Sequence, residues 1–366
     1  MIVSRRALGL GLLGLSVGGT AAYLYVGNRP GLLGSIGRID KLFGFAGGEK
    51  QALLADPAVV AALEGYGLSL DARQAGSVEM VREPALLSQN PQFLWPATAI
   101  LAELARKSGV KVRKDEAIFS SPLVVYSWTS VAGALEKNGL VTRFDGDHRG
   151  LDLAKLLRAM LDKKTWADEG ITDLYGRVRL VATDPTRSNS GFAFAGLVAN
   201  LLSGDVMTVD KLGAIQPQVT AVFNGMGFKP PSSGKLFDDY IGGGPGALPL
   251  AVGYENQLVE WILADPARWQ RVNAGGADRP VILYPMPSVL ATHPLLAIDA
   301  KSDRLIEALL SPPVQKLAWE GHGFRGPLGA SAGDLAARLG ASLPARISSV
   351  VPMPDADTML RMVGLA

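Results

Sequence analysis

The sequence predicts an α/β fold with mainly parallel sheets. From Arg38 onward, short apolar stretches that are typical of strands alternate with segments whose apolar residues recur at helical spacing. This alternation is expected when helices cover the faces of a sheet, and no internal repeat or low-complexity tract interrupts it. The chain has 366 residues, of which 48% are hydrophobic, so it is long enough for two lobes with substantial cores.

The expected elements follow in chain order. The apolar run 121–128 predicts a strand buried on both faces, since nearly every residue in it is apolar or small. Further strands are expected at 39–46, 68–72, 178–182, 247–252 and 281–285. Helices are expected at 53–63, 100–107, 130–137, 151–161, 192–202, 305–310 and 313–319, and one more is expected to open at Gly76.

Composition excludes several classes of function. The chain carries 36 Lys and Arg against 34 Asp and Glu, without a basic block interleaved with aromatic residues, so we expect no nucleic-acid partner. It has no cysteine, which rules out disulfides, thiolate metal sites and a cysteine nucleophile, and which suits an oxidising compartment. His148, His293 and His322 have no metal-ligand spacing. We expect no metal site and no cofactor.

Residues 1–37 are predicted to be an export signal or membrane anchor followed by a short tether. Arg5 and Arg6 precede an uncharged, glycine-rich apolar run at 7–27, which is long enough for one helical span of about 20 residues. Two alternatives stay open, an uncleaved hydrophobic helix and a cleaved signal peptide. The start resembles a twin-arginine signal, although paired arginines also occur in Sec signals. Either way, the folded part is expected on the periplasmic side of the inner membrane.

The stretch 183–191, between the strand expected at 178–182 and the following helix, is predicted to be a ligand cradle. Pro185 ends the strand, and Ser188, Asn189 and Ser190 place short polar side chains where a helix begins with unpaired N–H groups. Such a helix start favours a polar or anionic group. The alternative is that Ser188 or Ser190 only caps the helix. Similar strand-to-helix junctions elsewhere in the chain favour the ligand role.

Ligands in open parallel sheets bind beyond the carboxyl ends of strands. Glycine and small polar residues occupy further strand ends at Gly47-Gly48, Gly76-Ser77 and Ser127. Tyr254 follows another strand and is expected either to offer its phenol to a ligand or to be a packed residue with a satisfied hydroxyl.

Three carboxylates near these strand ends leave the ligand's charge open. If Glu49, Glu79 and Glu255 face the pocket, they favour an amino group or a cation; if they cap helices, the remaining donors favour an oxyanion. No nucleophile is paired with a base, so we expect no catalytic residue and no enzyme.

In the order of these segments the chain resembles the type II periplasmic solute-binding proteins, in the branch of molybdate, sulfate and phosphate binders. The resemblance is carried by 47–50, 76–80, 121–128, 183–191 and 253–257. It implies two α/β lobes joined by two crossover strands, one at 121–128 and the other around 275–285. The implied parts are lobe I at 38–125 and 281–366 and lobe II at 126–280.

The resemblance also implies a function and a site. The function is capture of a small polar solute, an oxyanion or another small molecule, for import by an inner-membrane ABC permease; the alternative is a membrane-anchored sensor or interaction protein with the same fold. Simple oxyanion binders have serine or threonine in the first loop, whereas this chain has Gly47-Gly48-Glu49. By position, the implied ligand-binding residues are Gly47, Gly48, Ser77, Ser127, Ser188, Asn189, Ser190 and Tyr254.

Overall fold

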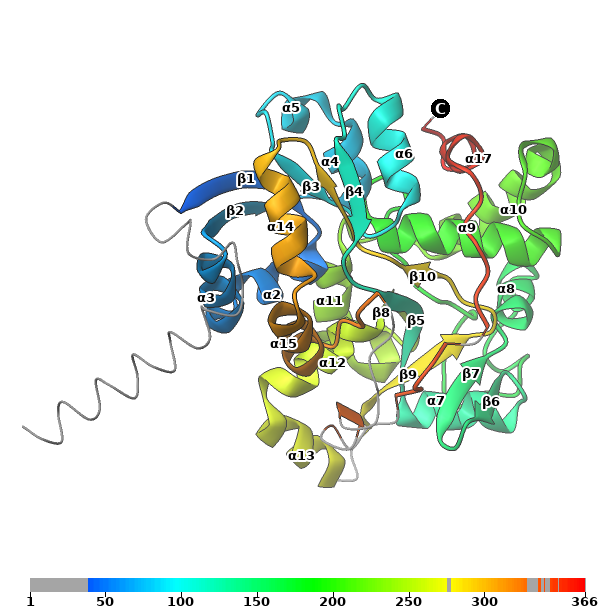
Figure 1. Ribbon diagram of the computed structural model, residues 1–366. Coiled ribbons are helices and arrows are strands. Elements are labelled where there is room, and N and C mark those ends of the chain that lie inside the picture. Colours follow the sequence, from blue (N-terminus) through cyan, green and yellow to red (C-terminus); the bar gives the residue numbers. More distant parts are fainter. Residues whose placement is uncertain are drawn as a thin grey trace, which may run out of the picture.

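The computed structural model describes residues 39–274, 278–327, 335–336, 339, 343–347 and 349–365. The predicted N-terminal helix and tether at 1–37 lie outside this range, as do residues 275–277 of the second expected crossover. The described residues form two β-sheets, each with its own helices (Figure 1). The predicted two-lobed α/β architecture is therefore confirmed.

The first sheet takes its strands from two distant parts of the chain. In β11, Leu295 and Ala297 pack on one side of the sheet and Leu296 packs on the other, as the two-residue period of a strand requires. The sheet order is β2–β1–β3–β11–β4, with β1 (Asp40–Ala46), β2 (Leu68–Gln74), β3 (Phe93–Trp95), β4 (Lys114–Ala117) and β11 (Pro294–Ala297). Its helices are η1 (Gly48–Lys50), α2 (Gln51–Ala55), α3 (Pro57–Gly65), α4 (Ser77–Arg82), α5 (Pro84–Leu87), α6 (Ile100–Lys107), α14 (Lys301–Leu309) and α15 (Pro312–His322).

The second sheet is built around β5, and every residue of this strand is buried. The sheet order is β10–β5–β9–β7–β6 with β8 also paired to β5, and the strands are β5 (Ser121–Trp128), β6 (Val141–Phe144), β7 (His148–Leu151), β8 (Ala251–Tyr254), β9 (Pro280–Pro285) and β10 (Leu290–Ala291). Its helices are α7 (Thr129–Lys137), α8 (Leu153–Leu161), α9 (Asn189–Ser203), η2 (Val209–Lys211), α10 (Leu212–Gly225), α11 (Ser233–Ala247), α12 (Glu255–Ala264) and α13 (Pro266–Ala274).

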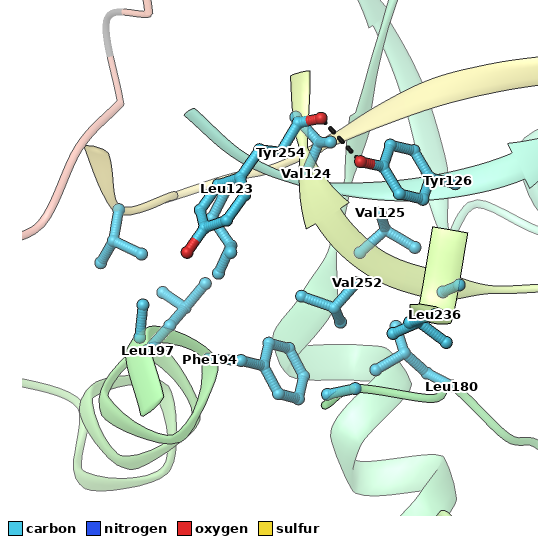
Figure 2. Close-up of a cluster of buried hydrophobic side chains, with 14 of the residues drawn as sticks. Leu123, Val124, Val125, Tyr126, Leu180, Phe194, Leu197, Leu236, Val252 and Tyr254 are labelled. Atoms are coloured by element: carbon cyan, nitrogen blue, oxygen red, sulfur yellow. Dashed lines mark hydrogen bonds between the residues drawn. The ribbon is translucent and has the colours of Figure 1, made fainter. Parts of the chain in front are cut away.

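The side chains of β5 alternate between partners above and below the sheet. Figure 2 shows Leu123 to Tyr126 meeting apolar residues of α9, α11 and β8, among them Phe194 and Leu236. The Tyr126 hydroxyl donates a 2.6 Å hydrogen bond to the backbone oxygen of Tyr254, so its one polar atom is satisfied in the core. The continuous apolar run of the sequence corresponds to a strand covered on both faces.

Two expectations about the sheets were wrong. The sheets are not mainly parallel, because β5 runs antiparallel to β8, β9 and β10, and β11 runs antiparallel to β3 and β4. β5 is the first strand that the chain forms after it leaves the first sheet, and β11 is the first after it returns. The segment expected as a strand at 178–182 forms only an isolated bridge between Val181 and Ala251.

The chain passes from the first sheet to the second between β4 and β5 and returns after β9 through β10 to β11. A third tie is the C-terminal helix α17 (Ala356–Met362), which packs on both α6 and α10 (Figure 1). Asp357 pairs with Lys107 of α6 at 2.7 Å, and Gln216 of α10 donates to the Arg361 backbone oxygen at 2.8 Å. Among the described helices, none combines the length and the apolarity that a membrane crossing requires.

Candidate ligand-binding site

A cavity of about 370 Å³ lies between the two lobes. One wall comes from the ends of β1 and β2 and the turns that follow them, and the other comes from the starts of α9, α11 and α12. The lining residues are Gly47, Gly48, Glu49, Gln74, Ala75, Gly76, Ser77, Glu79, Arg187, Ser188, Asn189, Pro231, Ser232, Ser233 and Tyr254.

Helix starts converge on this cavity. Ser188 is the N-cap of the 15-residue helix α9, and Ser232 is the N-cap of the 15-residue helix α11, where its Oγ accepts from the Lys235 N–H at 3.3 Å. The first turn of a helix leaves N–H groups without backbone acceptors and carries a partial positive charge. Backbone donors therefore lie along the wall that the second lobe contributes.

Six of the eight expected site residues line this cavity: Gly47, Gly48, Ser77, Ser188, Asn189 and Tyr254. The other two are turned away from it. Ser127 is fully buried in β5, where its Oγ donates to the Pro249 backbone oxygen at 3.2 Å. Ser190 lies one position into α9, where its Oγ is 2.7 Å from the Thr183 Oγ1.

The serines at the start of α11 were not expected in the site. Ser232 and Ser233 follow Pro230 and Pro231, a run that reads as a loop, but serine before a helical stretch is also an N-cap signal. Ser77 and Ser233 are largely buried residues of the cavity wall, and within the described part of the chain neither hydroxyl has a hydrogen-bond partner. They are available to a ligand.

Asn189 and Tyr254 meet at the wall formed by the second lobe. The Asn189 Nδ2 donates to the Tyr254 hydroxyl at 2.8 Å, while the Asn189 Oδ1 is buried without a partner among the described residues. Burial raises the pKa of the Tyr254 phenol, and the nearby Glu49 carboxylate adds to the effect. The phenol is therefore neutral, and it keeps its proton as a donor.

Glu49 brings a buried charge to the opposite wall. Its carboxylate is ion-paired with Lys50, which is fully buried, and its Oε1 lies 3.6 Å from the Nδ1 of His293. Burial favours the neutral acid, but the attraction of Lys50 and the contact with His293 outweigh it and hold the pKa of Glu49 far below its usual range. Burial and the charge of Lys50 lower the pKa of His293 to about 4, despite Glu49. At neutral pH, Glu49 is ionised and His293 is neutral.

Glu79 and Arg187 face each other across the mouth of the cavity. Glu79 belongs to α4 in the first lobe and Arg187 precedes α9 in the second, and their Oε1 and Nε atoms are 2.5 Å apart. Next to them the Val78 N–H donates to the Arg187 backbone oxygen at 3.2 Å. These direct contacts between the lobes define a closed arrangement.

Glu255 does not line the cavity. It is fully buried at the start of α12, where both carboxylate oxygens accept from Arg325 at 2.7 and 2.9 Å and the Tyr284 hydroxyl donates at 2.7 Å. Of the three carboxylates considered from the sequence, Glu49 and Glu79 thus face the cavity and Glu255 does not. Within the described ranges, no cluster of three His, Asp or Glu side chains is placed to hold a metal ion.

Solved structures with a similar fold are periplasmic binding proteins. The chain is similar to the sulfate-binding protein SubI from Mycobacterium tuberculosis (TM-score 0.51, 18% identity, covering 83% of this chain and 92% of that one). It is also similar to the periplasmic binding protein AfuA from Actinobacillus pleuropneumoniae, solved with fructose 6-phosphate (TM-score 0.55, 13% identity, 88% and 96% covered).

A third similar structure is the apo ferric-ion-binding protein A from Pasteurella haemolytica (TM-score 0.51, 11% identity, 89% and 96% covered). No family model and no curated protein sequence matches the chain. At these identities the comparisons establish the fold, and the resemblance stated from the sequence is confirmed at that level.

Proposed function

We propose that this protein captures a small polar solute between its lobes in the periplasm and delivers it to an inner-membrane ABC permease. The observation that carries the proposal is the cavity lined by both lobes, with Ser77 on one side and Ser233 on the other, both with hydroxyls that have no partner among the described residues. A ligand that bonds to both serines stabilises the closed state relative to the open one, and this is how binding drives a hinge motion. The named ligands of similar structures, sulfate and fructose 6-phosphate, are both small and polar.

The location follows from the same proposal. Residues 7–27 serve as a membrane anchor or as a cleaved export signal, and the twin-arginine route is one way across the membrane. We retain two lobes joined by two connections, and we place the boundaries where the chain passes between the sheets, between β4 and β5 and between β10 and β11, instead of within β5 at 125 and within β9 at 281. The proposed anchor is the segment 7–27, since the 366 residues contain no cysteine that could be lipidated.

A single substitution tests capture by closure. A Cβ added to Gly76 would lie 2.4 Å from the backbone oxygen of Arg187, which belongs to the other lobe. Alanine accepts the backbone angle of Gly76, φ −63°, so Gly76→Ala should leave both lobes folded. The added Cβ would also lie 2.7 Å from the Glu79 Oε2, but that is the end of a side chain that can shift, whereas the Arg187 backbone oxygen cannot, so the main effect is on closure. Gly133→Ala, on α7 with open space around the added Cβ, is the matched control.

The full-length protein is screened by thermal shift against oxyanions, sugar phosphates, amino acids, sugars and metal ions, since a bound solute raises the melting temperature by mass action. A compound that stabilises the wild type and Gly133→Ala, but not Gly76→Ala, supports capture between the lobes. Small-angle scattering should show ligand-induced compaction in the wild type and in Gly133→Ala, but not in Gly76→Ala. Equal binding and equal compaction in Gly76→Ala would refute the proposal.

A further inference from the structure

The cavity is larger than a free tetrahedral oxyanion requires. Its volume is about 370 Å³. At roughly 30 Å³ for each water-sized group, that space holds about twelve non-hydrogen atoms, whereas sulfate or phosphate has five. A bare oxyanion would fill less than half of the site, so the dimensions favour an organic molecule.

One part of the cavity is rich in donors. The starts of α9 and α11 supply backbone N–H groups, and Ser77 and Ser233 supply hydroxyls without protein partners in the described residues. Among the described residues that line the cavity, Arg187 is the sole cation, and it is already paired with Glu79. This part suits an oxyanion held by neutral donors and helix dipoles.

Another part of the cavity carries acceptors. Glu49 is ionised there, and the Oδ1 of Asn189 is buried without a partner in the described chain. A carboxylate repels a second anion, and a buried amide oxygen without a donor is unfavourable. Lys50 balances Glu49 and Arg187 balances Glu79, so the walls have no net charge to attract a highly charged ligand. The group that lies against Glu49 and Asn189 must therefore donate hydrogen bonds.

We propose that the solute is a small organic oxyanion that also carries a hydroxyl or ammonium donor, with its oxyanion at the starts of α9 and α11 and its donor on Glu49 and Asn189. This rests on the proposed function and specifies the class of solute. Free sulfate and other donor-free oxyanions satisfy only the donor-rich part of the site.

Calorimetry with the full-length protein separates the classes. The probes are sulfate, inorganic phosphate, propyl phosphate, O-phosphoethanolamine and glycerol 3-phosphate; the last two carry an ammonium or hydroxyl donor, and propyl phosphate is a donor-free molecule of similar size. We expect one of the two donor-bearing probes to bind at least tenfold more tightly than propyl phosphate and sulfate, and which of them it is identifies the donor. Equal or tighter binding of sulfate or propyl phosphate, or no binding of any probe, overturns this inference.

Two variants locate the donor contact. Asn189→Ala removes the acceptor without leaving a buried charge unpaired, and it should lower the affinity for the better donor-bearing probe about tenfold while changing that for propyl phosphate less than twofold. Glu49→Gln should act in the same direction, although it leaves Lys50 buried without its partner. Uniform loss for every probe in Asn189→Ala would contradict the assignment. If sulfate binds best and Gly76→Ala abolishes that binding, capture by closure stands and only the solute class proposed here is wrong.

Discussion

The Glu79 carboxylate accepts a hydrogen bond from the Arg187 side chain across the mouth of the cavity, with 2.5 Å between Oε1 and Nε. The Glu79 side chain is 28% exposed and that of Arg187 is 49% exposed. Glu79 also accepts from the Gly76 backbone N–H at 3.2 Å, so the carboxylate is held in place before Arg187 reaches it. The pair joins the two lobes, and under the proposed function it must break to admit a solute.

Because this ion pair is partly exposed, we expect a small and salt-sensitive coupling between its members. A double-mutant cycle with Glu79→Gln and Arg187→Gln should give a coupling free energy of about 0.5 to 1 kcal/mol in low salt. The coupling should fall in 0.5 M salt, where screening is stronger. Urea unfolding of the four proteins measures it. A coupling that does not change with salt would mean that the contact is not electrostatic.

The buried pair of Glu255 and Arg325 should behave differently. Their side chains are 0% and 5% exposed, so Glu255→Gln leaves a guanidinium in the core without the carboxylate that balances its charge. We expect the free energy of unfolding to fall by about 3 to 5 kcal/mol. Glu320→Gln is the matched control, since its pair with Lys316 is 49% and 70% exposed and should contribute at most about 1 kcal/mol. Similar losses in the two variants, measured by urea unfolding, would contradict this account.

His293 should make the protein less stable in mild acid. Its folded pKa of about 4 lies below the unfolded value of 6.5, so between these values the unfolded chain binds the extra proton. Stability should therefore fall as the pH drops from about 7 to 4, by on the order of 3 kcal/mol in total. His293→Asn, which tolerates the left-handed φ of 41°, should flatten this loss in urea titrations. An unchanged slope between pH 6.5 and 4.5 would rule His293 out as the cause.

His322 should have the opposite pH dependence. Its Nδ1 is 2.5 Å from Glu260 and its Nε2 is 3.1 Å from Asp56. Burial works against the charged ring, but these two carboxylates raise the pKa of His322 above its usual value. The stabilisation is then fully present below about pH 6.5 and is lost as the pH rises through the folded pKa.

The matching variant is His322→Gln. It should cost about 1 kcal/mol of unfolding free energy at pH 6 and clearly less at pH 8.5, because at high pH the wild-type ring is neutral as well. Urea unfolding at the two pH values checks this. An equal loss at both would show that packing, and not charge, accounts for the effect of the residue.

The main helices and strands could be predicted from local patterns because the strongest elements are also the best buried ones, whereas the two lobes were implied by the resemblance to a known family. The strand at 121–128 and the helix at 100–107 were predicted with their observed bounds, the first from an unbroken apolar run and the second from its helical periodicity. The helices α10 and α11 were missed. Pro217 lies inside the first, and Gly244 with Pro245 kinks the second, so composition alone argues against both.

The site residues were harder to predict than the fold, because the direction of a side chain depends on tertiary packing. Ser77 and Ser188 both begin helices at the cavity, as expected. Ser127 also ends a strand, but its hydroxyl is taken by the Pro249 backbone oxygen of a neighbouring segment that the sequence does not place. Ser232 and Ser233 enter the site from a segment more than 40 residues after the cradle, which no local pattern connects with it.

The position of β11 has a consequence for the order of assembly. This strand lies between β3 and β4 and pairs with both, yet it is almost 180 residues later in the chain than β4. During synthesis, the stretch through β4 emerges with a gap in its sheet that nothing nearby in sequence fills. All strands of the second sheet are synthesised before β11 appears, so the first lobe begins to form first but is completed last. The slow formation of such non-local contacts is expected to limit the folding rate of the first lobe. A chain exported before that point would cross the membrane with its first lobe still incomplete.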